Sequence, residues 1–404
     1  MIEFPIDHKL FTETLETWGS MLEDIHHATQ SIDFEQFYIT ADEASAKFVD
    51  ALIERAKNGV KIRCHLDSAG SFSFANSKMY KDMRAAGIEI KFFNWLIPFT
   101  KGFHKFGFFR NHRRLLLVDS DTESPIAHHG GICIGKDVEK WADISVRISV
   151  GKNSISPIPN IDDIPHPIAS MKKSFDELWD RSESLKVSWT NIDVTDLRSS
   201  LRKYRTEHQK LVDEKNKLFN PERRLPFTYV TQSPIPGKHN LYRALEKMIS
   251  NAVEHVTIST PYFLPTHRIM RKLVRARKRG VVVTIIIPEK SDHPIVDIGA
   301  RTYISYFLEH DISIYRHPRM IHGKAIEIDG KWAMVGTMNL DNISLRYNFE
   351  SGIISGSESF VLDVEQNLSD LRIQSKIINM ETWQKRGLRN KIAELLVWPF
   401  RKFL

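Results

Sequence analysis

Two kinds of apolar pattern alternate along the first part of the chain. Residues 32–39, 60–67 and 88–93 alternate apolar and polar positions, as half-buried strands do. Between them, residues 48–57 and 79–86 place apolar side chains at helical spacing, and a glycine follows each segment within two residues, as is common at helix ends. Strands that alternate with helices predict an α/β layered fold.

The same order of elements returns in the second part of the chain. Strand and helix patterns follow one another at residues 255–260, 270–276, 281–287, 303–308 and 312–315. Ala252 stands at the place that matches Ala28, and Gly280 at the place that matches Gly59, with a nearly constant spacing between the copies. A register held through several elements indicates a duplicated α/β unit, which is the sequence signature of a repeat.

The composition describes a folded, basic chain. Its 404 residues, 42% of them hydrophobic, suffice for two domains with a core each. The two cysteines, Cys64 and Cys133, cannot build a disulfide framework, which favours a reducing compartment. A net charge of +7 favours an anionic partner such as nucleic acid, acidic lipid or a phosphorylated substrate. Without a signal-peptide pattern or a long apolar run, we expect a soluble or peripherally bound protein.

One segment of the second half combines a histidine, a lysine and an amide. His322 and Lys324 stand two residues apart, so that a strand would place them on one face. The Asp-Gly pair at 329–330 predicts a hairpin, whose returning strand brings Thr337 and Asn339 back toward the histidine. An imidazole that attacks or protonates, with a cation and an amide that hold anionic oxygens, suits a phosphodiester substrate.

A related segment stands in the first half. There His112 is followed by Arg114 and, after four further residues, by Asp119, with a Gly-Gly-Ile-Cys run ending at Cys133. Double displacement at phosphorus needs a nucleophile and an acid for the leaving alcohol. We therefore expect the halves to pack about a pseudo-two-fold axis, with both histidines facing one active site at their interface.

These residues resemble the paired HKD motifs of the phospholipase D superfamily. Flanking segments narrow the likeness to the bacterial cardiolipin synthases, over residues 15–375. Those flanks are residues 38–39, 111–113, 141–143, 260–265, 279–281, 288–292, 336–341 and 348–350. The resemblance implies two phospholipase D-like α/β/α sandwich domains, in a short form of the enzyme without N-terminal transmembrane helices. It also implies metal-independent catalysis through a phosphohistidine, with no cofactor.

The resemblance implies a role for each motif residue. His112 would form the phosphatidyl-enzyme, and His322 would protonate the departing glycerol and then deprotonate the incoming alcohol. The sequence leaves open which histidine is the nucleophile. The catalytic set also contains Arg114 and Lys324, which together with Asn339 would neutralise the phosphate. Its last members are Asp119 and Asp329, which would support the site. The expected substrate-binding set is Asn339, Thr337, Glu350, Tyr38, Tyr262 and Cys133, with Glu350 orienting a catalytic histidine.

Three features depart from the family pattern. Arg114 replaces the usual lysine, which keeps the charge but changes its geometry. Cys133 stands where the family has asparagine, which removes one phosphate donor. Ten residues separate Asp119 from Gly130, against six in the second half. An inactive lipid-binding relative therefore stays an alternative.

The chain divides into four predicted parts. These are an N-terminal domain at 1–195, a charged linker at 196–226, a C-terminal domain at 227–375 and a basic amphipathic segment at 376–404. The aromatic and basic stretch at 95–110 and the C-terminal segment are candidates for contact with an anionic membrane surface. An equally open interpretation is that these two segments simply cover a hydrophobic core.

The leading hypothesis is phosphatidyl transfer between two phosphatidylglycerols, which gives cardiolipin and glycerol, at the cytoplasmic side of the cell membrane. The close alternative is hydrolysis, or transfer to another alcohol, at the same site. A nuclease is less favoured, so nucleic acid is not the expected partner. No metal is expected, because the adjacent histidines at 26–27 and 128–129 lack the spacing of a helical metal site. Oligomeric state stays undetermined.

Overall fold

The structure is a computed structural model that describes residues 6–94, 109–150, 166–184, 227–234, 238–397 and 399. The predicted linker at 196–226 lies outside these residues, as does most of the aromatic stretch at 95–110. Within the described ranges, no helix combines the length and apolar character needed to cross a bilayer.

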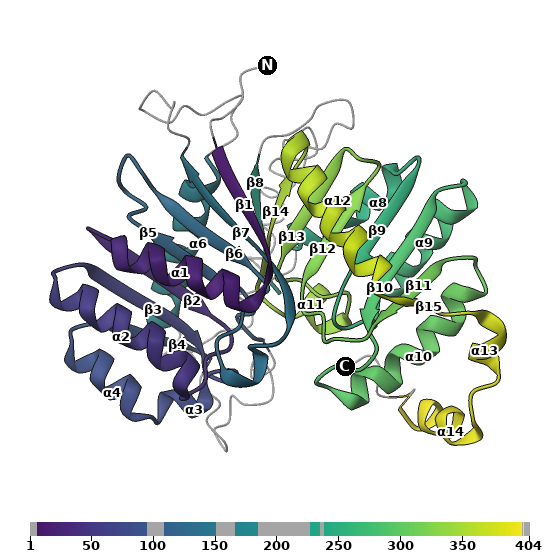
Figure 1. Ribbon diagram of the computed structural model, residues 1–404, viewed down its shortest axis with the longest axis horizontal. Coiled ribbons are helices and arrows are strands. Elements are labelled where there is room, and N and C mark those ends of the chain that lie inside the picture. The colour runs from purple at the N-terminus through teal and green to yellow at the C-terminus, as the bar shows by residue number, and fades with distance from the viewer. Residues whose placement is uncertain are drawn as a thin grey trace, which may run out of the picture.

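Within the described residues, the first half forms one seven-stranded sheet with the order β1-β7-β6-β5-β2-β3-β4 (Figure 1). Its strands are β1 (Ile6–Glu13), β2 (Ser31–Gln36), β3 (Lys61–Asp67), β4 (Glu89–Phe93), β5 (Leu115–Val118), β6 (Ile126–Gly130) and β7 (Ala142–Val150). Its helices are α1 (Thr14–His27), α2 (Glu43–Lys57), α3 (Phe72–Ala75), α4 (Lys78–Ala85), the 3-10 helix η1 (Lys136–Val138) and α6 (Pro167–Ser184). Strands β2, β3 and β4 are parallel, and the other pairs are antiparallel.

The described part of the second half forms an eight-stranded sheet with the order β15-β11-β10-β9-β12-β13-β14-β8. Its strands are β8 (Thr228–Gln232), β9 (His255–Ser259), β10 (Val282–Pro288), β11 (Ser313–His317), β12 (Lys324–Ile328), β13 (Trp332–Gly336), β14 (Glu350–Ser355) and β15 (Lys376–Ile377). Its helices are α8 (Asn240–Asn251), α9 (His267–Lys278), α10 (Pro294–Leu308), α11 (Asn342–Arg346), α12 (Glu358–Ile373), α13 (Met380–Gln384) and α14 (Leu388–Val397).

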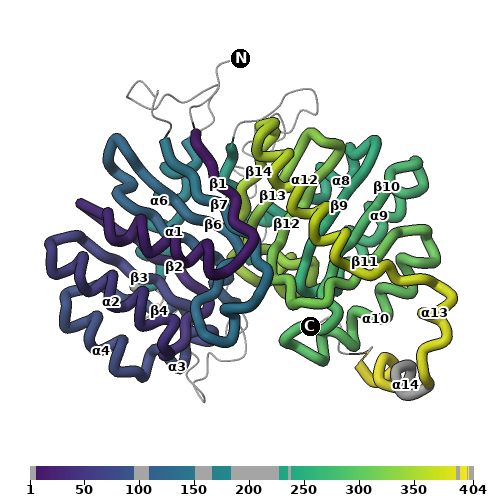
Figure 2. Tube along the Cα trace, in the orientation of Figure 1, coloured from purple at the N-terminus to yellow at the C-terminus, as the bar shows by residue number. Residues whose placement is uncertain are grey.

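The two sheets have the same strand order, because β8 to β14 occupy the places of β1 to β7 and β15 is added at one edge. The predicted duplication into two α/β units is confirmed. Figure 2 shows the first half in purple and teal beside the second half in green and yellow. Helix α10 begins at Pro294, earlier than the apolar pattern at 303–308 indicates, because proline at the first helical turn leaves no N–H unpaired.

Side-chain capping explains several helix boundaries. The Asp42 carboxylate accepts hydrogen bonds from the backbone N–H groups of Ala44 and Ser45 and starts α2. The Thr266 hydroxyl accepts a hydrogen bond from the backbone N–H of Ile269 and starts α9 in the same way. Gly59 follows α2 with a φ of +88°, a left-handed conformation that glycine adopts without strain.

A shared hydrophobic core joins the halves. Strand β5 is buried on both faces, and its alternate residues enter different cores. Leu116 and Val118 pack within the first half. Leu115 and Leu117 pack in a cluster that also contains Val335 and other residues of the second half. Because the sheets meet through this apolar layer, the ends of β5 and β12 are held at a fixed distance from one another.

Candidate active site

The polypeptide backbone ties each predicted histidine to the opposite half of the molecule. His112 lies just ahead of β5, and His322 lies just ahead of β12. The His112 N–H donates to the Phe349 carbonyl oxygen at 2.9 Å, and the His322 N–H donates to the Ala142 carbonyl oxygen at 2.7 Å. Phe349 precedes β14 and Ala142 begins β7, so the two halves hold each other's histidine segments in equivalent ways.

His112 is buried between a carboxylate and a guanidinium. Its Nδ1 lies 3.0 Å from Oε2 of Glu350, which belongs to the second half. Its Nε2 lies 3.0 Å from Nη2 of Arg114, whose Nη1 donates to the His112 carbonyl oxygen at 2.9 Å. The Phe37 ring packs edge-on against the imidazole with 4.7 Å between centroids. The ring is thus fixed on three sides.

His322 has the corresponding environment with the halves exchanged. Its Nδ1 lies 2.7 Å from Oδ2 of Asp143, which belongs to the first half. Its Nε2 lies 2.7 Å from Nζ of Lys324, which also donates to the His322 carbonyl oxygen at 2.6 Å. The Trp141 ring lies 5.0 Å away between centroids. One lysine nitrogen therefore makes both contacts that Arg114 makes with two nitrogens.

The two histidine clusters share one electrostatic environment. Burial first, then Arg114 and Lys324, lowers the pKa of His112 well below its ordinary value of 6.5. Burial and Lys324 lower the pKa of His322 to about 4, and Arg114 contributes to that shift. Lys324 lowers the pKa of His112, and Arg114 lowers the pKa of His322. The predicted meeting of the two motifs at one interface is therefore confirmed. These lowered pKa values favour the neutral form of both imidazoles.

The cations determine which imidazole nitrogen carries the proton. A guanidinium can only donate, so Nε2 of His112 keeps its lone pair beside Arg114. The proton then lies on Nδ1 and is donated to Glu350. Burial raises the pKa of Glu350 to about 8, so this carboxyl group holds a proton more readily than an ordinary glutamate does. The resulting tautomer leaves Nε2 free to attack an electrophile.

Asp143 differs from Glu350 in the direction of its pKa shift. Burial acts to raise the pKa of Asp143, but His322, Lys324 and Arg114 together bring it below its ordinary value. An ionised Asp143 favours a positive charge on His322. The two otherwise equivalent histidines thus have different carboxylate partners, one with a raised pKa and one with a lowered pKa.

Polar side chains around Glu350 complete this side of the cluster. The Thr337 hydroxyl donates to Oε2 of Glu350, and Nδ2 of Asn348 donates to Oε1 at 3.3 Å. The predicted Asp-Gly hairpin is confirmed, because β12 pairs with β13 and Lys324 lies opposite Gly336. This pairing brings Thr337 back to the histidine end of β12.

Three buried polar atoms in the cluster have no hydrogen-bond partner among the described residues. They are Nε of Arg114, Oδ1 of Asn339 and Oδ1 of Asn348. Buried polar atoms are normally paired, so an unpaired guanidinium N–H can serve an anionic oxygen of a ligand. Cys133 stands at the position that matches Asn339, and its sulfur lies 3.5 Å from Nη2 of Arg114. The cluster therefore has an amide on one side and a thiol on the other.

Tyr38 and Tyr262 occupy equivalent places in the repeat, after β2 and β9. The Tyr38 hydroxyl donates to Asp137 and the Tyr262 hydroxyl donates to Asp292, each at 2.7 Å. Burial raises the pKa of both phenols. The structure brings neither hydroxyl into hydrogen-bonding contact with the histidines.

Asp119 and Asp329, expected to support the site, lie at the far ends of β5 and β12 from the histidines. The Asp119 carboxylate accepts hydrogen bonds from the N–H groups of residues 29–31 at 2.7–2.9 Å. The Asp329 carboxylate accepts from the N–H groups of residues 253–255 at 2.8–2.9 Å. Both aspartates have left-handed backbone, with φ of 49° and 59°. They hold the starts of β2 and β9 and do not contact the reacting groups.

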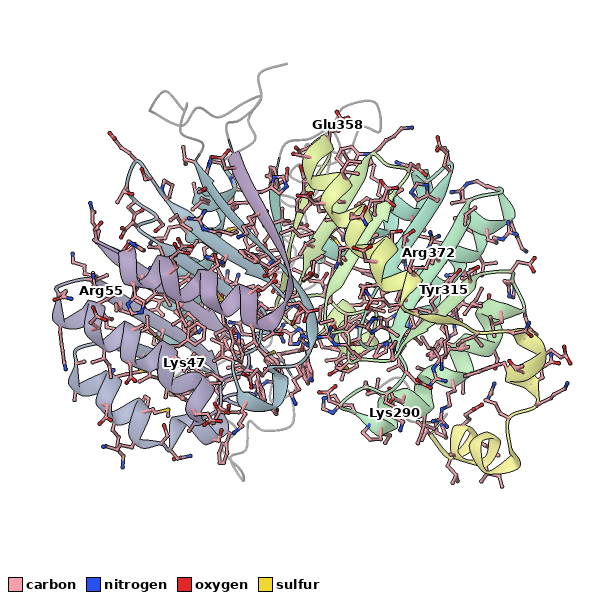
Figure 3. All side chains as sticks on the ribbon, in the orientation of Figure 1. Lys47, Arg55, Lys290, Tyr315, Glu358 and Arg372 are labelled. Carbon is pink, nitrogen blue, oxygen red and sulfur yellow. The ribbon has the colours of Figure 1, made fainter. Side chains whose placement is uncertain are left out.

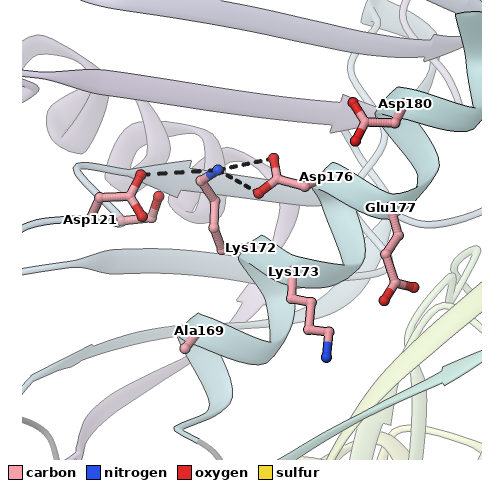
Figure 4. A pocket seen from close by; sticks show the side chains of 8 residues that line it. Asp121, Ala169, Lys172, Lys173, Asp176, Glu177 and Asp180 are labelled. Atoms are coloured by element: carbon pink, nitrogen blue, oxygen red, sulfur yellow. Dashed lines mark hydrogen bonds and ion pairs between the residues drawn. The ribbon is translucent and has the colours of Figure 1, made fainter.

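An open groove along α6 lies apart from this cluster. Figure 4 shows Lys172 reaching Asp176 and Asp121 within it. Asp121 follows Asp119 in the turn beyond β5, at the end away from His112. Lysines and carboxylates line the groove without a histidine or cysteine, so it has no features of a reactive site. Among the described residues, no group of three or more His, Cys, Asp or Glu side chains is arranged to hold a metal ion.

The duplicated fold, with two histidines held by exchanged carboxylates, is that of a phospholipase D-like protein. The model of the family described as "Cardiolipin synthase, PLD-like domain" matches residues 21–132 and 245–372, and the chain belongs to this family. The resemblance drawn from the motifs is thereby confirmed.

Individual relatives agree with the family match. A cardiolipin synthase of Clostridium perfringens is 26% identical over 400 residues, which cover 97% of this chain and 75% of that protein. A cardiolipin synthase A of Klebsiella pneumoniae is 26% identical over 407 residues, with coverage of 98% and 75%. The crystal structure of phosphatidylserine synthase from Haemophilus influenzae matches with a TM-score of 0.67 at 13% identity, over 98% of this chain and 95% of that one. This last likeness shows a common fold.

Proposed function

We propose that the protein is a phosphatidyltransferase that joins two phosphatidylglycerols into cardiolipin and releases glycerol. The observation that carries this proposal is the pair of buried histidines, each oriented by a carboxylate of the other half. Two imidazoles of different electrostatic character provide the nucleophile and the acid that double displacement requires. The names of the relatives support a phospholipid substrate.

In the first step, Nε2 of His112 attacks the phosphorus of one phosphatidylglycerol. A P–N bond forms, the P–O bond to glycerol breaks, and protonated His322 gives its proton to the departing oxygen. The anionic phosphodiester offsets the charges of Lys324 and Arg114, so the pKa of His322 rises when substrate binds. Ionised Asp143 stabilises the imidazolium that results. Arg114 and Lys324 hold the equatorial oxygens of phosphorus.

In the second step, the terminal hydroxyl of a second phosphatidylglycerol gives its proton to His322 and attacks phosphorus. The new P–O bond forms as the P–N bond to His112 breaks, and cardiolipin leaves. Water in place of the lipid alcohol would give phosphatidic acid, which is the hydrolytic alternative at the same site. The proposed place of reaction is the cytoplasmic surface of the cell membrane, with the protein bound peripherally.

The test uses purified protein and phosphatidylglycerol vesicles, with products separated by lipid mass spectrometry. Cardiolipin and glycerol in equal amounts are the expected result. Acid-labile, base-stable phosphate on His112 should be trapped early in the reaction and be absent from the His112→Asn variant. Phosphatidic acid as the sole product would show that the protein is a hydrolase and not a transferase. Absence of both product and adduct would reject the proposal.

A further inference from the structure

Two exposed apolar side chains stand at equivalent positions in the two halves. Phe72 begins α3, after β3, and is 60% exposed. Ile295 lies in the first turn of α10, after β10, and is 50% exposed. Their separation in the chain is close to the period of the repeat. The parallel strands β3 and β10 end at the same side of the molecule as the histidines, so both residues project from that side.

A short chain of contacts links Phe72 to the nucleophile. The hydroxyl of the preceding residue, Ser71, donates to the Phe37 carbonyl oxygen at 3.3 Å, and the Phe37 ring packs on His112. Asp67, at the end of β3, accepts from the Asn111 N–H at 2.9 Å, directly ahead of His112. Phe72 therefore lies beside the first motif.

Ile295 is linked to the other side of the site. Asp292, three residues earlier, accepts from the Tyr262 hydroxyl at 2.7 Å. The ring of His293 lies 5.4 Å from that of Tyr262, between centroids. In Figure 1, α3 and the start of α10 lie on the same lower edge, to either side of the junction between the halves.

The same edge continues onto the C-terminal helix. Helix α14 packs against α10, and its Leu395 and Leu396 are 73% and 67% exposed. Exposed charged residues of both signs stand near it in the chain, Lys78 after Phe72, and Glu289, Lys290 and Asp292 before Ile295. Figure 3 labels Lys290 at this edge. Exposed apolar side chains on the histidine side of the molecule suit insertion into the interface of a bilayer.

We propose that this rim, defined as Phe72, Ile295, Leu395 and Leu396, is the surface by which the protein docks on a phospholipid bilayer. The inference rests on the proposed function, because a membrane phospholipid substrate must enter the site that the rim borders. Insertion of side chains on both sides of the junction turns the histidine ends of β5 and β12 toward the headgroups. A lipid can then reach His112 without leaving the bilayer entirely.

The experiment compares a rim variant, Phe72→Ser/Ile295→Ser, with a matched control, Val253→Ser/Val282→Ser. Val253 and Val282 are 64% and 57% exposed but lie at the opposite, amino ends of β9 and β10. Co-sedimentation with phosphatidylglycerol vesicles should be at least about 10-fold weaker for the rim variant, because two apolar side chains no longer insert. The control should stay within about 2-fold of wild type.

Turnover of short-chain phosphatidylglycerol, dissolved below its micelle concentration, separates docking from chemistry. Both variants should match wild type in that assay, and the rim variant alone should lose activity on vesicles. Equal vesicle binding by rim and control variants would overturn the docking surface, as would a rim variant that changes only the oligomeric state in sedimentation. Rim-dependent vesicle binding without any cardiolipin would instead reject the proposed function and leave the docking surface standing.

Discussion

Glu350 lies 3.0 Å from Nδ1 of His112, although 238 residues separate them in the chain. The reciprocal pair, Asp143 and His322, is 2.7 Å apart across 179 residues. The carboxylate that contacts each motif histidine therefore comes from the opposite half. These two contacts form only when both halves are folded and packed together.

Replacing either carboxylate by its amide should damage catalysis without unfolding the protein. Glu350→Gln and Asp143→Asn keep shape but weaken the acceptor that holds the imidazole tautomer. We expect kcat to fall roughly 10²- to 10⁴-fold in each. Steady-state kinetics with circular dichroism as a folding control checks this. Asp137→Asn, which removes a carboxylate that accepts from Tyr38, serves as the matched control; wild-type kcat in Glu350→Gln would contradict the orienting role.

Arg114 should tolerate lysine but not alanine. Lys324 contacts both Nε2 and the carbonyl oxygen of His322 with one nitrogen, so a lysine at 114 can do the same for His112. Arg114→Lys should keep activity within about 10-fold of wild type. Arg114→Ala should lose about 10²- to 10³-fold, the usual cost of removing one anion-stabilising donor. Near-complete loss in the lysine variant would mean that the planar guanidinium itself is required.

Cys133→Asn should raise the activity of the enzyme. An amide there would match Asn339 in the second half and add a donor beside Arg114, where the thiol now lies 3.5 Å from Nη2. The expected effect is a rise in kcat/KM, largest when combined with Arg114→Lys. Cys64→Ser, a buried cysteine of the first-half core, controls for the loss of a thiol. A fall in kcat/KM for Cys133→Asn with unchanged stability would show that the thiol suits this substrate better.

The pH profile should reflect Lys324. Burial lowers its pKa to about 7, so the ammonium is present below pH 7 and is lost as the pH rises through that value. For an anionic substrate, kcat/KM should therefore fall on the alkaline side, by up to about tenfold per pH unit. Lys324→Arg keeps its charge and should move that alkaline limb to higher pH, whatever its absolute rate. If the alkaline limb stays near pH 7 in this variant, it reflects the titration of a group other than Lys324.

Asp119→Asn should affect the free energy of unfolding more than it affects kcat. The carboxylate accepts three backbone N–H bonds, whose weakening costs about 1–3 kcal/mol in the free energy of unfolding. Burial acts to raise the pKa of Asp119, but these bonds bring it below its ordinary value of 3.8. The stabilisation is therefore complete above about pH 4 and is lost as the pH falls further.

Urea unfolding at pH 7 and pH 3 measures this effect. The difference between wild type and Asp119→Asn should shrink at pH 3. Asp121→Asn, in the same turn with a side chain 72% exposed, should change little at either pH. Loss of kcat in a fully folded Asp119→Asn sample would return Asp119 to the catalytic set.

Local patterns predict much of the molecule. Alternation and helical spacing predict most central strands and helices, because each pattern depends on which side chains one element buries. The Asp-Gly pair predicts the β12–β13 hairpin because these residues adopt its left-handed turn conformations readily. The role of Asp143 escapes this kind of inference, although it stands where Glu350 stands in the repeat, as the first or second residue of its strand.

By itself, the sequence determined the duplicated α/β architecture and the identity of the two histidines with their cations, because these depend on short-range spacing and on chemical type. Only the tertiary structure decided which carboxylate each histidine contacts, and that Asp119 and Asp329 bind backbone N–H groups away from the site. The reason is physical: hydrogen bonds between halves depend on how two sheets pack through their shared apolar layer. That packing sets distances between residues that no local pattern relates.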